Sequence, residues 1–286
     1  MKITSHTQVE PRLAKDIRAL ESKLKTHDGI DSEMYIADNL NFDTTLPWVF
    51  TMHKDEELIA AVVSFIPAKK EIELMAVTHP DYRRKGYFSM LENRLCETWE
   101  KHKIPSLLYV LNEDSETGKA VAQRRGASYQ YTEYLMELRG QNFLEVNGKL
   151  EIMKAKADQV DTLANIQERA FGLPGEDART FISAALKKSN HHMFLSYYQG
   201  SPIGMGAIAV DEEASSIYGV CVLPEHQGFG YGKEIMVHLI KEATRLSNKK
   251  VTLEVDSKNE RAYQMYRKLG FVATKSTGYY QKALQQ

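Results

Sequence analysis

The chain has 286 residues, of which 43% are hydrophobic, so it can form one large domain or two ordinary ones around a packed core. Its net charge of −1 gives no electrostatic footprint for nucleic acid or for an anionic membrane. The sequence begins without an apolar signal segment, and no run is long enough to span a bilayer. Cys96 and Cys221 lie far apart and lack metal-binding spacing, which favours a reducing, cytoplasmic setting over a disulfide framework.

The first half of the chain is predicted to be an α+β unit. It opens with an amphipathic helix, because four apolar residues share one face at helical spacing: Leu13, Ile17, Leu20 and Leu24. Hairpin-like strands follow at Val49–Met52 and Leu58–Phe65. The loop Thr78–Phe88 then leads into a further helix, and another strand, another helix and a closing strand complete the unit.

The second half repeats this order. Its first helix is predicted from the apolar residues Leu163, Ile166, Ala170 and Phe171. Hairpin-like strands follow at Met193–Tyr197 and Ile203–Val210, and a strand at Ile217–Val222 runs into a glycine-rich loop. From Lys233 onward, apolar residues again recur at helical spacing: Ile235, Met236, Leu239, Ile240, Ala243 and Leu246.

An internal repeat relates the two halves. Shifting the second half back by 144 positions places Pro224 on Pro80 and Gly230 on Gly86, with no gap. A constant offset of about half the chain is typical of duplication, so two similar domains are predicted, spanning residues 1–140 and 141–286. The seam is expected near Arg139–Lys149, where asparagine and glycine interrupt the periodicity.

The loop after Val222 has the composition of a phosphate-binding turn. Gly228, Gly230 and Gly232 remove side chains where a helix begins, so free N–H groups and the positive end of the helix dipole can approach an anion. The loop lacks the Lys-Ser/Thr ending of a nucleoside-triphosphate loop and the glycine spacing of a dinucleotide fingerprint. A tight connection without a ligand is the alternative interpretation.

A second motif lies downstream, at Val251–Phe271. It consists of a β-branched strand followed by a helix that Gly270 closes. Together with the glycine loop, this motif resembles the GCN5-related N-acetyltransferase (GNAT) superfamily. The residues that fill the two family motifs in register are Gln227, Gly230, Gly232, Asn259, Ala262 and Tyr266.

The resemblance implies an α+β fold with a mixed sheet flanked by helices, present twice in tandem, and it implies acetyl-CoA as the co-substrate. Acetyl-CoA would lie where two neighbouring parallel strands splay apart. Backbone groups of Val220, Cys221 and Val222 would pair with its pantetheine arm, although these residues also suit a buried strand. Asn259 would contact the same arm, with a helix N-cap as its alternative role. The pyrophosphate would be held by the loop residues Gln227, Gly228, Phe229, Gly230, Tyr231, Gly232 and Lys233.

Two side chains are candidates for the proton transfers of a direct attack by an amine on the thioester. The phenol of Tyr266, with an ordinary pKa of about 10, can donate to the departing thiolate without being charged itself. Glu254 can accept the amine proton, as a glutamate at the matching place does in the ribosomal-protein N-terminal acetyltransferases. A carboxylate in an otherwise apolar strand also suggests a pocket. The alternatives are a Tyr266 that only packs its ring, a Glu254 that faces outward, and a water chain as the base.

Other reactive side chains are expected to have structural roles. Nothing near Cys221 in the sequence supplies a histidine or a positive field that would lower its pKa, so we expect it to pack. His226 is expected to be solvated. The pair His191–His192 lacks further ligands, so no metal site is predicted.

The first half departs from the family pattern, and we interpret it as a catalytically silent copy. Ala122 and Val110 stand in the places of the acid and the base, and Phe88 replaces the last loop glycine. The charges of Arg83–Lys85 leave open the weak binding of a CoA-like ligand, with a solvated loop as the alternative. Glu73 stands where some family members place a base, which leaves open an activity of the first half itself.

The leading prediction is the transfer of an acetyl group from acetyl-CoA to a primary amine of a small molecule or peptide, without a metal. A non-catalytic acyl-CoA-binding or regulatory protein is the alternative. The acceptor pocket is expected to include Phe171–Asp177 and Tyr279–Tyr280. No nucleic-acid or membrane partner is predicted, and the chain is expected to be a monomer or a homodimer.

Overall fold

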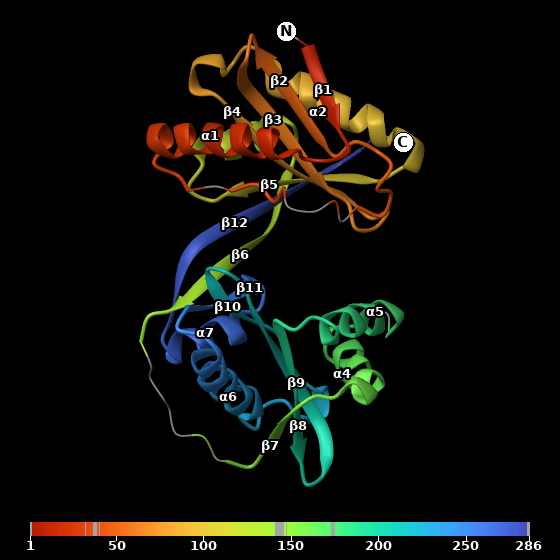
Figure 1. Ribbon diagram of the computed structural model, residues 1–286, viewed down its shortest axis with the longest axis vertical. Coiled ribbons are helices and arrows are strands. Elements are labelled where there is room, and N and C mark those ends of the chain that lie inside the picture. The colour runs from red at the N-terminus through yellow and green to blue at the C-terminus, as the bar shows by residue number, and fades with distance from the viewer. Residues whose placement is uncertain are drawn as a thin grey trace. The chain divides into compact units, whose positions relative to one another are not determined.

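The computed structural model describes residues 2–31, 33–36, 39, 41–140, 146, 148–172 and 175–284. These residues form two compact units, which are drawn in Figure 1. Unit 1 comprises Met1–Glu133 and Ser276–Gln286, and unit 2 comprises Tyr134–Lys275. Much of the predicted seam, Arg139–Lys149, lies outside the described residues.

Unit 1 is built on a mixed sheet. Its hydrogen-bonded strand order is β1-β2-β3-β4-β5-β12, and all of these neighbours are antiparallel except the parallel pair β4 and β5. Its elements are β1 Lys2–His6, α1 Pro11–Asp28, β2 Val49–Lys54, β3 Glu57–Phe65, β4 Ile72–Thr78, α2 Tyr87–Trp99, β5 Ser106–Asn112 and α3 Glu116–Arg124, with the first part of β6 Ser128–Leu138 and the last part of β12 Phe271–Ala283.

Unit 2 has the same kind of sheet. Its strand order is β7-β8-β9-β10-β11-β6, with β10 and β11 parallel and the strands from β7 to β10 antiparallel. Its elements are β7 Glu151–Lys154, α4 Val160–Phe171, α5 Gly175–Leu186, β8 His191–Tyr198, β9 Ser201–Val210, β10 Ala214–Val222, α6 Tyr231–Leu246, β11 Lys250–Asp256 and α7 Glu260–Lys268, with the remaining parts of β6 and β12.

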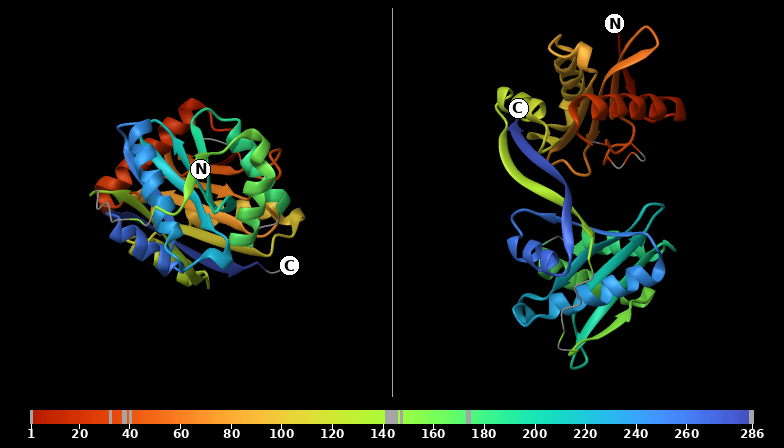
Figure 2. Two further views of the ribbon diagram at one scale, coloured as in Figure 1. Left: turned by 90° about the horizontal axis from the view of Figure 1, so that it is seen from below. Right: turned by 90° about the vertical axis from the view of Figure 1, so that its left-hand side faces the viewer.

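The two units exchange their closing strands. The end of β12 pairs with β5 of unit 1, from Thr277 opposite Asn112 to Ala283 opposite Ser106. The strand β6, which closes the first half of the sequence, instead lies beside β11 of unit 2. The neighbouring strands β6 and β12 are the segments along which the chain leaves and re-enters unit 1 (Figure 2). The boundary between the repeats near residue 140 stays a prediction. The two compact units cannot be separated at one position of the chain, because unit 1 contains both its beginning and its end.

The element positions confirm the internal repeat. The helices α2 and α6, the strands β5 and β11, and the helices α3 and α7 each begin 144 residues apart. Gly86 and Gly230 also share a left-handed backbone, with φ of +84° and +88°. The units differ between their first two strands. Among the described residues, unit 1 has the one helix α1 between β1 and β2, whereas unit 2 has α4 and α5 between β7 and β8.

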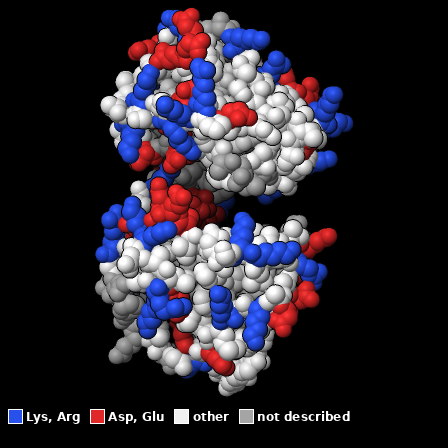
Figure 3. Space-filling model, viewed as in Figure 1, with Lys and Arg blue, Asp and Glu red and all other residues white. Residues whose placement is uncertain are grey.

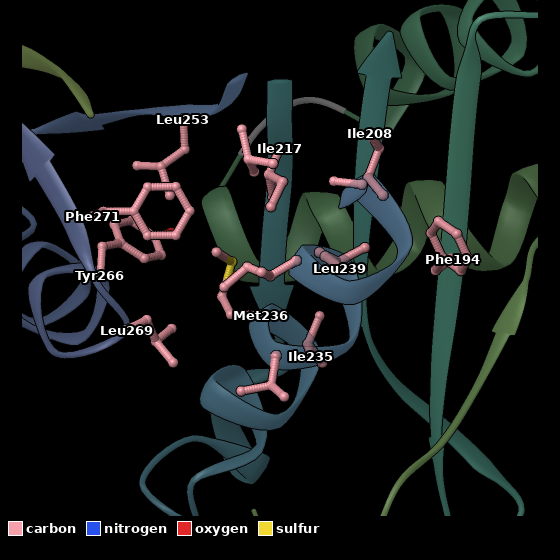
Figure 4. Close-up of a cluster of buried hydrophobic side chains, with 14 of the residues drawn as sticks. Phe194, Ile208, Ile217, Ile235, Met236, Leu239, Leu253, Tyr266, Leu269 and Phe271 are labelled. Atoms are coloured by element: carbon pink, nitrogen blue, oxygen red, sulfur yellow. The ribbon is translucent and has the colours of Figure 1, made fainter. Parts of the chain in front are cut away.

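In each unit, helices cover both faces of the sheet. In unit 1, α1 packs Ile17 against β2 and β3, and α2 packs Leu91 and Leu95 against the opposite face. In unit 2, α4 and α5 cover one face, and α6 and α7 cover the other. Figure 4 shows this second core, where Ile235, Met236 and Leu239 of α6 lie against the sheet. Phe171 does not join the apolar face of α4 as predicted, because it is the last residue of the helix and is 48% exposed.

The surface carries no single dominant charge. On the face drawn in Figure 3, lysine and arginine residues are interspersed with aspartate and glutamate over most of each unit, as the net charge of −1 leads one to expect. Within the part of the chain that the structure describes, no helix is long and apolar enough to cross a bilayer.

Candidate active site

The parallel strands of unit 2 splay apart. Residues Ala214–Ile217 of β10 pair with Lys250–Leu253 of β11, and Ile217 opposite Leu253 is the last pair. Both strands then continue, β10 to Val222 and β11 to Asp256, without pairing with each other. The backbone groups of Val220–Val222 on this side are therefore available to an extended ligand, as in β-strand addition.

A β-bulge lies at the same point of β10. On the side of β9, Tyr218 pairs with Ala207 while Cys221 pairs with Met205, so β10 carries an extra residue. Gly219 takes up the distortion with φ of +61°, a left-handed conformation that favours glycine. The bulge changes the side-chain alternation. Tyr218 and Cys221 are three positions apart, so they would face opposite sides of a regular strand, yet both pack against the core beneath α4 and α5.

The glycine loop connects the end of β10 to the N-terminus of α6. Gly228 and Gly230 have φ of +93° and +88°, so both positions require a left-handed backbone. The Gln227 side chain donates from Nε2 to the carbonyl of Val222 at 2.9 Å, which fixes the loop to the strand. The α6 helix then begins at Tyr231. Its N-cap residue is Gly230, so no side chain at that position occupies the first N–H groups of the helix.

The other loop residues lie around this opening. A Cβ at Gly232 would meet only Val222 Cγ2, at 4.0 Å, so there is open space beside this glycine. Phe229 is 64% exposed, whereas the ring of Tyr231 is buried against Tyr198. Such a loop of exposed amides at a helix N-terminus fits a pyrophosphate group.

Cys221 is a packing residue, as predicted. It is buried, and burial raises the pKa of its thiol to about 12. A thiol with so high a pKa stays protonated at neutral pH and is a poor nucleophile.

Tyr266 lies in the core of unit 2, next to the splayed strands. It is 8% exposed and meets the ring of Phe271 edge-on at 6.1 Å (Figure 4). Burial raises the pKa of its phenol to about 12, so the proton stays on the oxygen at neutral pH. This environment keeps the phenol a neutral donor, which is what an acid for the thiolate requires, and it also agrees with a packing role.

Glu254 and Asn259 combine features of both interpretations. Glu254 is exposed. The sequence suggested a pocket because a buried carboxylate in an apolar strand is costly, and an exposed carboxylate does not carry that cost. Asn259 caps α7, because its Oδ1 accepts a hydrogen bond from the amide of Ala262 at 3.2 Å. Since Oδ1 is used in the cap, the predicted contact of Asn259 with the cofactor arm would have to involve the Nδ2 group of its side chain.

Two aromatic groups that the sequence did not single out as functional also lie at the opening. Tyr218 is the last residue before the bulge, and its hydroxyl lies 2.7 Å from Nδ1 of His191. The ring of Phe181, from α5, meets Tyr218 edge-on at 6.1 Å. Tyr218 and His191 stand 27 residues apart in sequence, and their contact depends on the alignment of three strands, so no local motif reveals it.

Unit 1 contains a cavity of about 1000 Å³ at the equivalent place. The last pair between β4 and β5 is Leu74 opposite Tyr109, and the strands then separate as they do in unit 2. The cavity lies between these strands, α1, α3 and the loop Pro80–Ser89, and its lining is largely apolar. Cationic side chains that line it are Arg83, Arg84, Arg124 and Arg125.

The loop arginine of unit 1 is already paired. Arg83 Nε donates to the carbonyl of Thr78 at 3.2 Å, which corresponds to the bond that Gln227 makes in unit 2. Its two terminal nitrogens donate to both carboxylate oxygens of Asp28, at 2.9 and 2.5 Å. This bidentate bond, with the neighbouring charges, lowers the pKa of Asp28 to about 2. Arg84 lines the cavity and makes no such bond within the described part of unit 1, so it is the better placed of the two for an anion.

The degenerate positions of unit 1 have packing roles. Ala122 is buried in the core, and Ser115 caps α3 through the amide of Gly118 at 3.1 Å, as Asn259 caps α7. Phe88 packs against the core and lines the cavity. Burial and the nearby carboxylates of Glu71 and Glu133 raise the pKa of Glu73 to about 7.

No metal centre is built from the described side chains. Within residues 2–284, gaps in the description excepted, no group of three or more His, Cys, Asp or Glu residues is close enough to share a metal ion. His191 instead meets Tyr218, and His192 lies 3.3 Å from the amine of Lys154.

The part of the predicted acceptor pocket at Phe171–Asp177 is described only incompletely. Leu173, Pro174 and the side chain of Asp177 lie outside the described residues. The other part, Tyr279–Tyr280, belongs to unit 1, where Tyr279 stacks on Tyr131 with ring centroids 4.4 Å apart.

Unit 2 thus has a parallel pair of strands that splays beside a glycine loop and a helix N-terminus, the arrangement that the sequence resemblance implies. Residues 160–271 match the model of the acetyltransferase (GNAT) family. An alanine N-acetyltransferase of ribosomal protein bS18 from Escherichia coli K12 is 28% identical over 120 residues, which cover 41% of this chain and 77% of that protein. The relative from Shigella flexneri with the same name matches equally.

Solved structures share the whole fold. A GCN5-related N-acetyltransferase from Sphaerobacter thermophilus superposes with a TM-score of 0.85 at 15% identity, covering 100% of this chain and 96% of that one. A tandem GNAT protein from the clavulanic acid biosynthesis pathway superposes with a TM-score of 0.73 at 12% identity, covering 100% and 99%. The match to the GNAT family lies within unit 2, and the fold of a tandem GNAT protein extends over the whole chain. The family match and the named relatives support an acyltransferase that acts on amino groups.

Proposed function

We propose that this chain transfers an acetyl group from acetyl-CoA to a primary amine, and that the chemistry takes place in unit 2. The observation that carries this proposal is the separation of β10 from β11 after the pair Ile217 and Leu253, next to the glycine loop. Two candidate residues for the proton transfers support it: Glu254 directly follows Leu253 on β11, and Tyr266 of α7 packs in the same core as Ile217 and Leu253.

The residues of unit 2 divide the reaction between them. Backbone groups of Val220–Val222 would align the pantetheine arm, and the amides of Gly228–Lys233 would bind the pyrophosphate. Glu254 would take a proton from the ammonium group, which leaves a neutral amine to attack the thioester carbonyl. When the C–S bond breaks, Tyr266 would give its proton to the thiolate. The amine loses a second proton, which replaces the one given by Tyr266.

The proposed acceptor is the α-amino group of a peptide. The Escherichia coli relative is named for an alanine of ribosomal protein bS18, and the match to the family model, at residues 160–271, lies in the unit proposed here as catalytic. A small primary amine is the other acceptor class that the mechanism accommodates. The cytoplasmic location and the monomeric or dimeric state stay predictions.

The test is thiol release from acetyl-CoA by the full-length chain, measured with a panel of peptides and small amines. We expect release that depends on an amine, with mass spectrometry showing one added acetyl group on the acceptor. An alanine-initiated peptide and its N-terminally blocked form provide the matched pair. No amine-dependent release across the panel, from a chain that binds acetyl-CoA, would favour the non-catalytic alternative.

We also propose that unit 1 binds a CoA-type ligand without turning it over. The cavity of about 1000 Å³ supports this, together with Arg84 and Arg124 in its lining. The test is the stoichiometry of CoA binding to the full chain by calorimetry. Ala120→Glu adds a negative charge to the cavity lining and should remove one of two sites, whereas Gln123→Glu changes the same helix outside the lining and should remove none. One site per chain, unaffected by Ala120→Glu, would contradict binding in unit 1.

A further inference from the structure

The sheet face opposite α6 carries an additional candidate for the amine deprotonation. Ser216 Oγ lies 3.0 Å from Thr252 Oγ1, so these two side chains project from the same face of the paired part of β10 and β11. Side chains alternate along a strand, which places Tyr218 and Glu254 on this face too, one on each side of the point where the strands separate. Ile217 and Leu253 project to the opposite face, into the core with α6.

Tyr218 stands at the opening itself. It directly follows the last residue of β10 that pairs with β11, and it precedes the bulge at Gly219. It is half-buried, with Phe181 of α5 against one edge of its ring. Its ring packs on the face that α4 and α5 cover, so an acceptor amine would have to approach the hydroxyl from that face.

His191 stands behind Tyr218 as a proton acceptor. Its Nδ1 lies 2.7 Å from the Tyr218 hydroxyl, a normal distance for donation by the hydroxyl to an unprotonated ring nitrogen. The groups that surround the ring are Tyr218 of β10, Ala209 opposite it on β9 and Lys188 after α5. Burial and the charge of Lys188 lower the pKa of His191, so the imidazole is neutral and able to accept at neutral pH.

We propose that Tyr218 and His191 carry the amine proton away from the reaction. Resting on the function proposed above, this assigns Tyr218 as a catalytic residue and His191 as the residue that positions it and receives its proton. The ammonium group gives a proton to the Tyr218 oxygen while the Tyr218 hydroxyl proton passes to His191 Nδ1. The imidazolium then releases it to solvent, and the neutral amine attacks. In this arrangement Tyr218 takes the proton that was assigned to Glu254 above, and Glu254, on the other side of the opening, holds the ammonium group by its charge.

The pair also explains a difference between the units. At the opening of unit 1, Glu73 precedes the last pair of β4 and β5, and no bulge interrupts the register of β3 and β4. Unit 2 has no carboxylate on β10: Ser216 precedes its last pair with β11, and Tyr218 follows that pair. In this proposal, a phenol that is hydrogen-bonded to a neutral imidazole accepts the amine proton in place of a carboxylate, and it does so without a fixed negative charge.

The first experiment compares turnover of the full-length chain with that of Tyr218→Phe and His191→Gln, using an amine that the wild type acetylates. General base catalysis contributes about 10² to 10⁴ in rate, so we expect kcat to fall about 100-fold in Tyr218→Phe. His191→Gln keeps a hydrogen-bonding side chain without the basic nitrogen, and we expect about a 10-fold fall. The KM for acetyl-CoA should change by less than about 3-fold in both variants.

His192→Gln is the matched control, because His192 lies beside His191 in sequence but contacts Lys154 instead of Tyr218. Its kcat should equal that of the wild type. In His191→Ala, added imidazole should restore part of the turnover, which a purely structural role would not predict. The nitrogen chemical shifts of His191 should change in Tyr218→Phe, independently of any activity.

The outcomes separate this inference from the proposed function. Active wild type with kcat within about 2-fold in both Tyr218→Phe and His191→Gln would overturn the inference and leave the function intact. Loss of turnover in Glu254→Gln alone would assign the base to Glu254. Absence of acetyl transfer by the wild type would contradict the function and this inference together. If a variant unfolds, as shown by circular dichroism, the other variant and the imidazole rescue decide.

Discussion

Unit 1 and unit 2 share one frame and differ where chemistry is expected. The helix pairs α2 with α6 and α3 with α7 keep a constant offset, and both parallel strand pairs splay. Unit 2 adds a bulge, an open glycine at Gly232 and the phenol of Tyr266. Unit 1 has filled these places with packing side chains, yet it contains the large cavity. The large cavity and the candidate catalytic residues are therefore found in different units of this fold.

The largest expected effect concerns Tyr266, the proposed acid of unit 2, whose place in unit 1 is taken by Ala122. Tyr266→Phe should lower kcat about 100-fold or more, because the thiolate would leave without a proton, while acetyl-CoA affinity changes little. Steady-state kinetics and calorimetry on the same preparation measure the two quantities. Tyr263→Phe, on the same helix with its ring against Tyr134, is the control and should be near wild type. Equal turnover of both variants would leave unit 2 without its distinguishing acid.

The loop glycines offer a matched pair across the units. Gly230→Ala and Gly86→Ala each force an alanine into a left-handed backbone, with φ of +88° and +84°. Each should lower the free energy of unfolding by about 1 kcal/mol. Only Gly230→Ala should also weaken acetyl-CoA binding at the catalytic site and reduce kcat/KM. An equal loss of kcat/KM in both variants would indicate that the units act together.

The helix caps form a second matched pair. Asn259→Ala and Ser115→Ala each remove an oxygen that accepts from the first turn of α7 or α3. Each change should cost about 1 kcal/mol of stability in urea denaturation. If Asn259 also contacts the cofactor arm, its variant alone should raise the KM for acetyl-CoA. An unchanged KM would reduce Asn259 to a cap.

The smallest expected effects concern the ion pairs that hold each loop to its first helix. The pKa of Asp28 is lowered from its ordinary 3.8 to about 2, so the folded state binds this proton less tightly than the unfolded state. The resulting stability is present above about pH 4 and is lost as the pH falls toward about 2. Asp28→Asn should therefore cost about 1 kcal/mol at pH 7. Urea denaturation at pH 7 and at pH 3 should show a smaller difference from wild type at the lower pH.

The comparison pair in unit 2 is Arg169 with Glu225, at 2.8 Å, and both side chains are nearly half exposed. Water and salt screen such a pair, so Glu225→Gln should change the free energy of unfolding less than Asp28→Asn does. A larger loss in Glu225→Gln than in Asp28→Asn would reverse the order expected from burial.

Local patterns predicted much of the fold. The helical spacing of Leu13, Ile17 and Leu20 and the constant offset between Gly86 and Gly230 both correspond to features of the structure. Such features depend on residues close together in sequence, or on a register that duplication preserves. The strand composition of β6 and β12 gives no information on which sheet each strand joins, so their exchange was not foreseen.

The missed features of the sites all depend on contacts between distant residues. Asp28 and Arg83 lie 55 residues apart, and their bond becomes apparent only when the end of α1 meets the loop before α2. The cavity of unit 1 results from how five elements pack, and no composition reveals an unfilled space. Tyr218 reads as an ordinary strand residue, and its contact with His191 becomes apparent only when β8, β9 and β10 are aligned in the sheet.

The most direct test exchanges the residue that distinguishes the two loops. Gly232→Phe copies Phe88 of unit 1 into unit 2, where a Cβ meets only Val222 Cγ2 at 4.0 Å, so the change should fill ligand space without disturbing the fold. Phe88→Ala makes the opposite change in unit 1. We predict that amine-dependent thiol release by the full-length chain is lost in Gly232→Phe and retained in Phe88→Ala. Release that survives Gly232→Phe and disappears in Phe88→Ala would contradict the assignment of catalysis to unit 2.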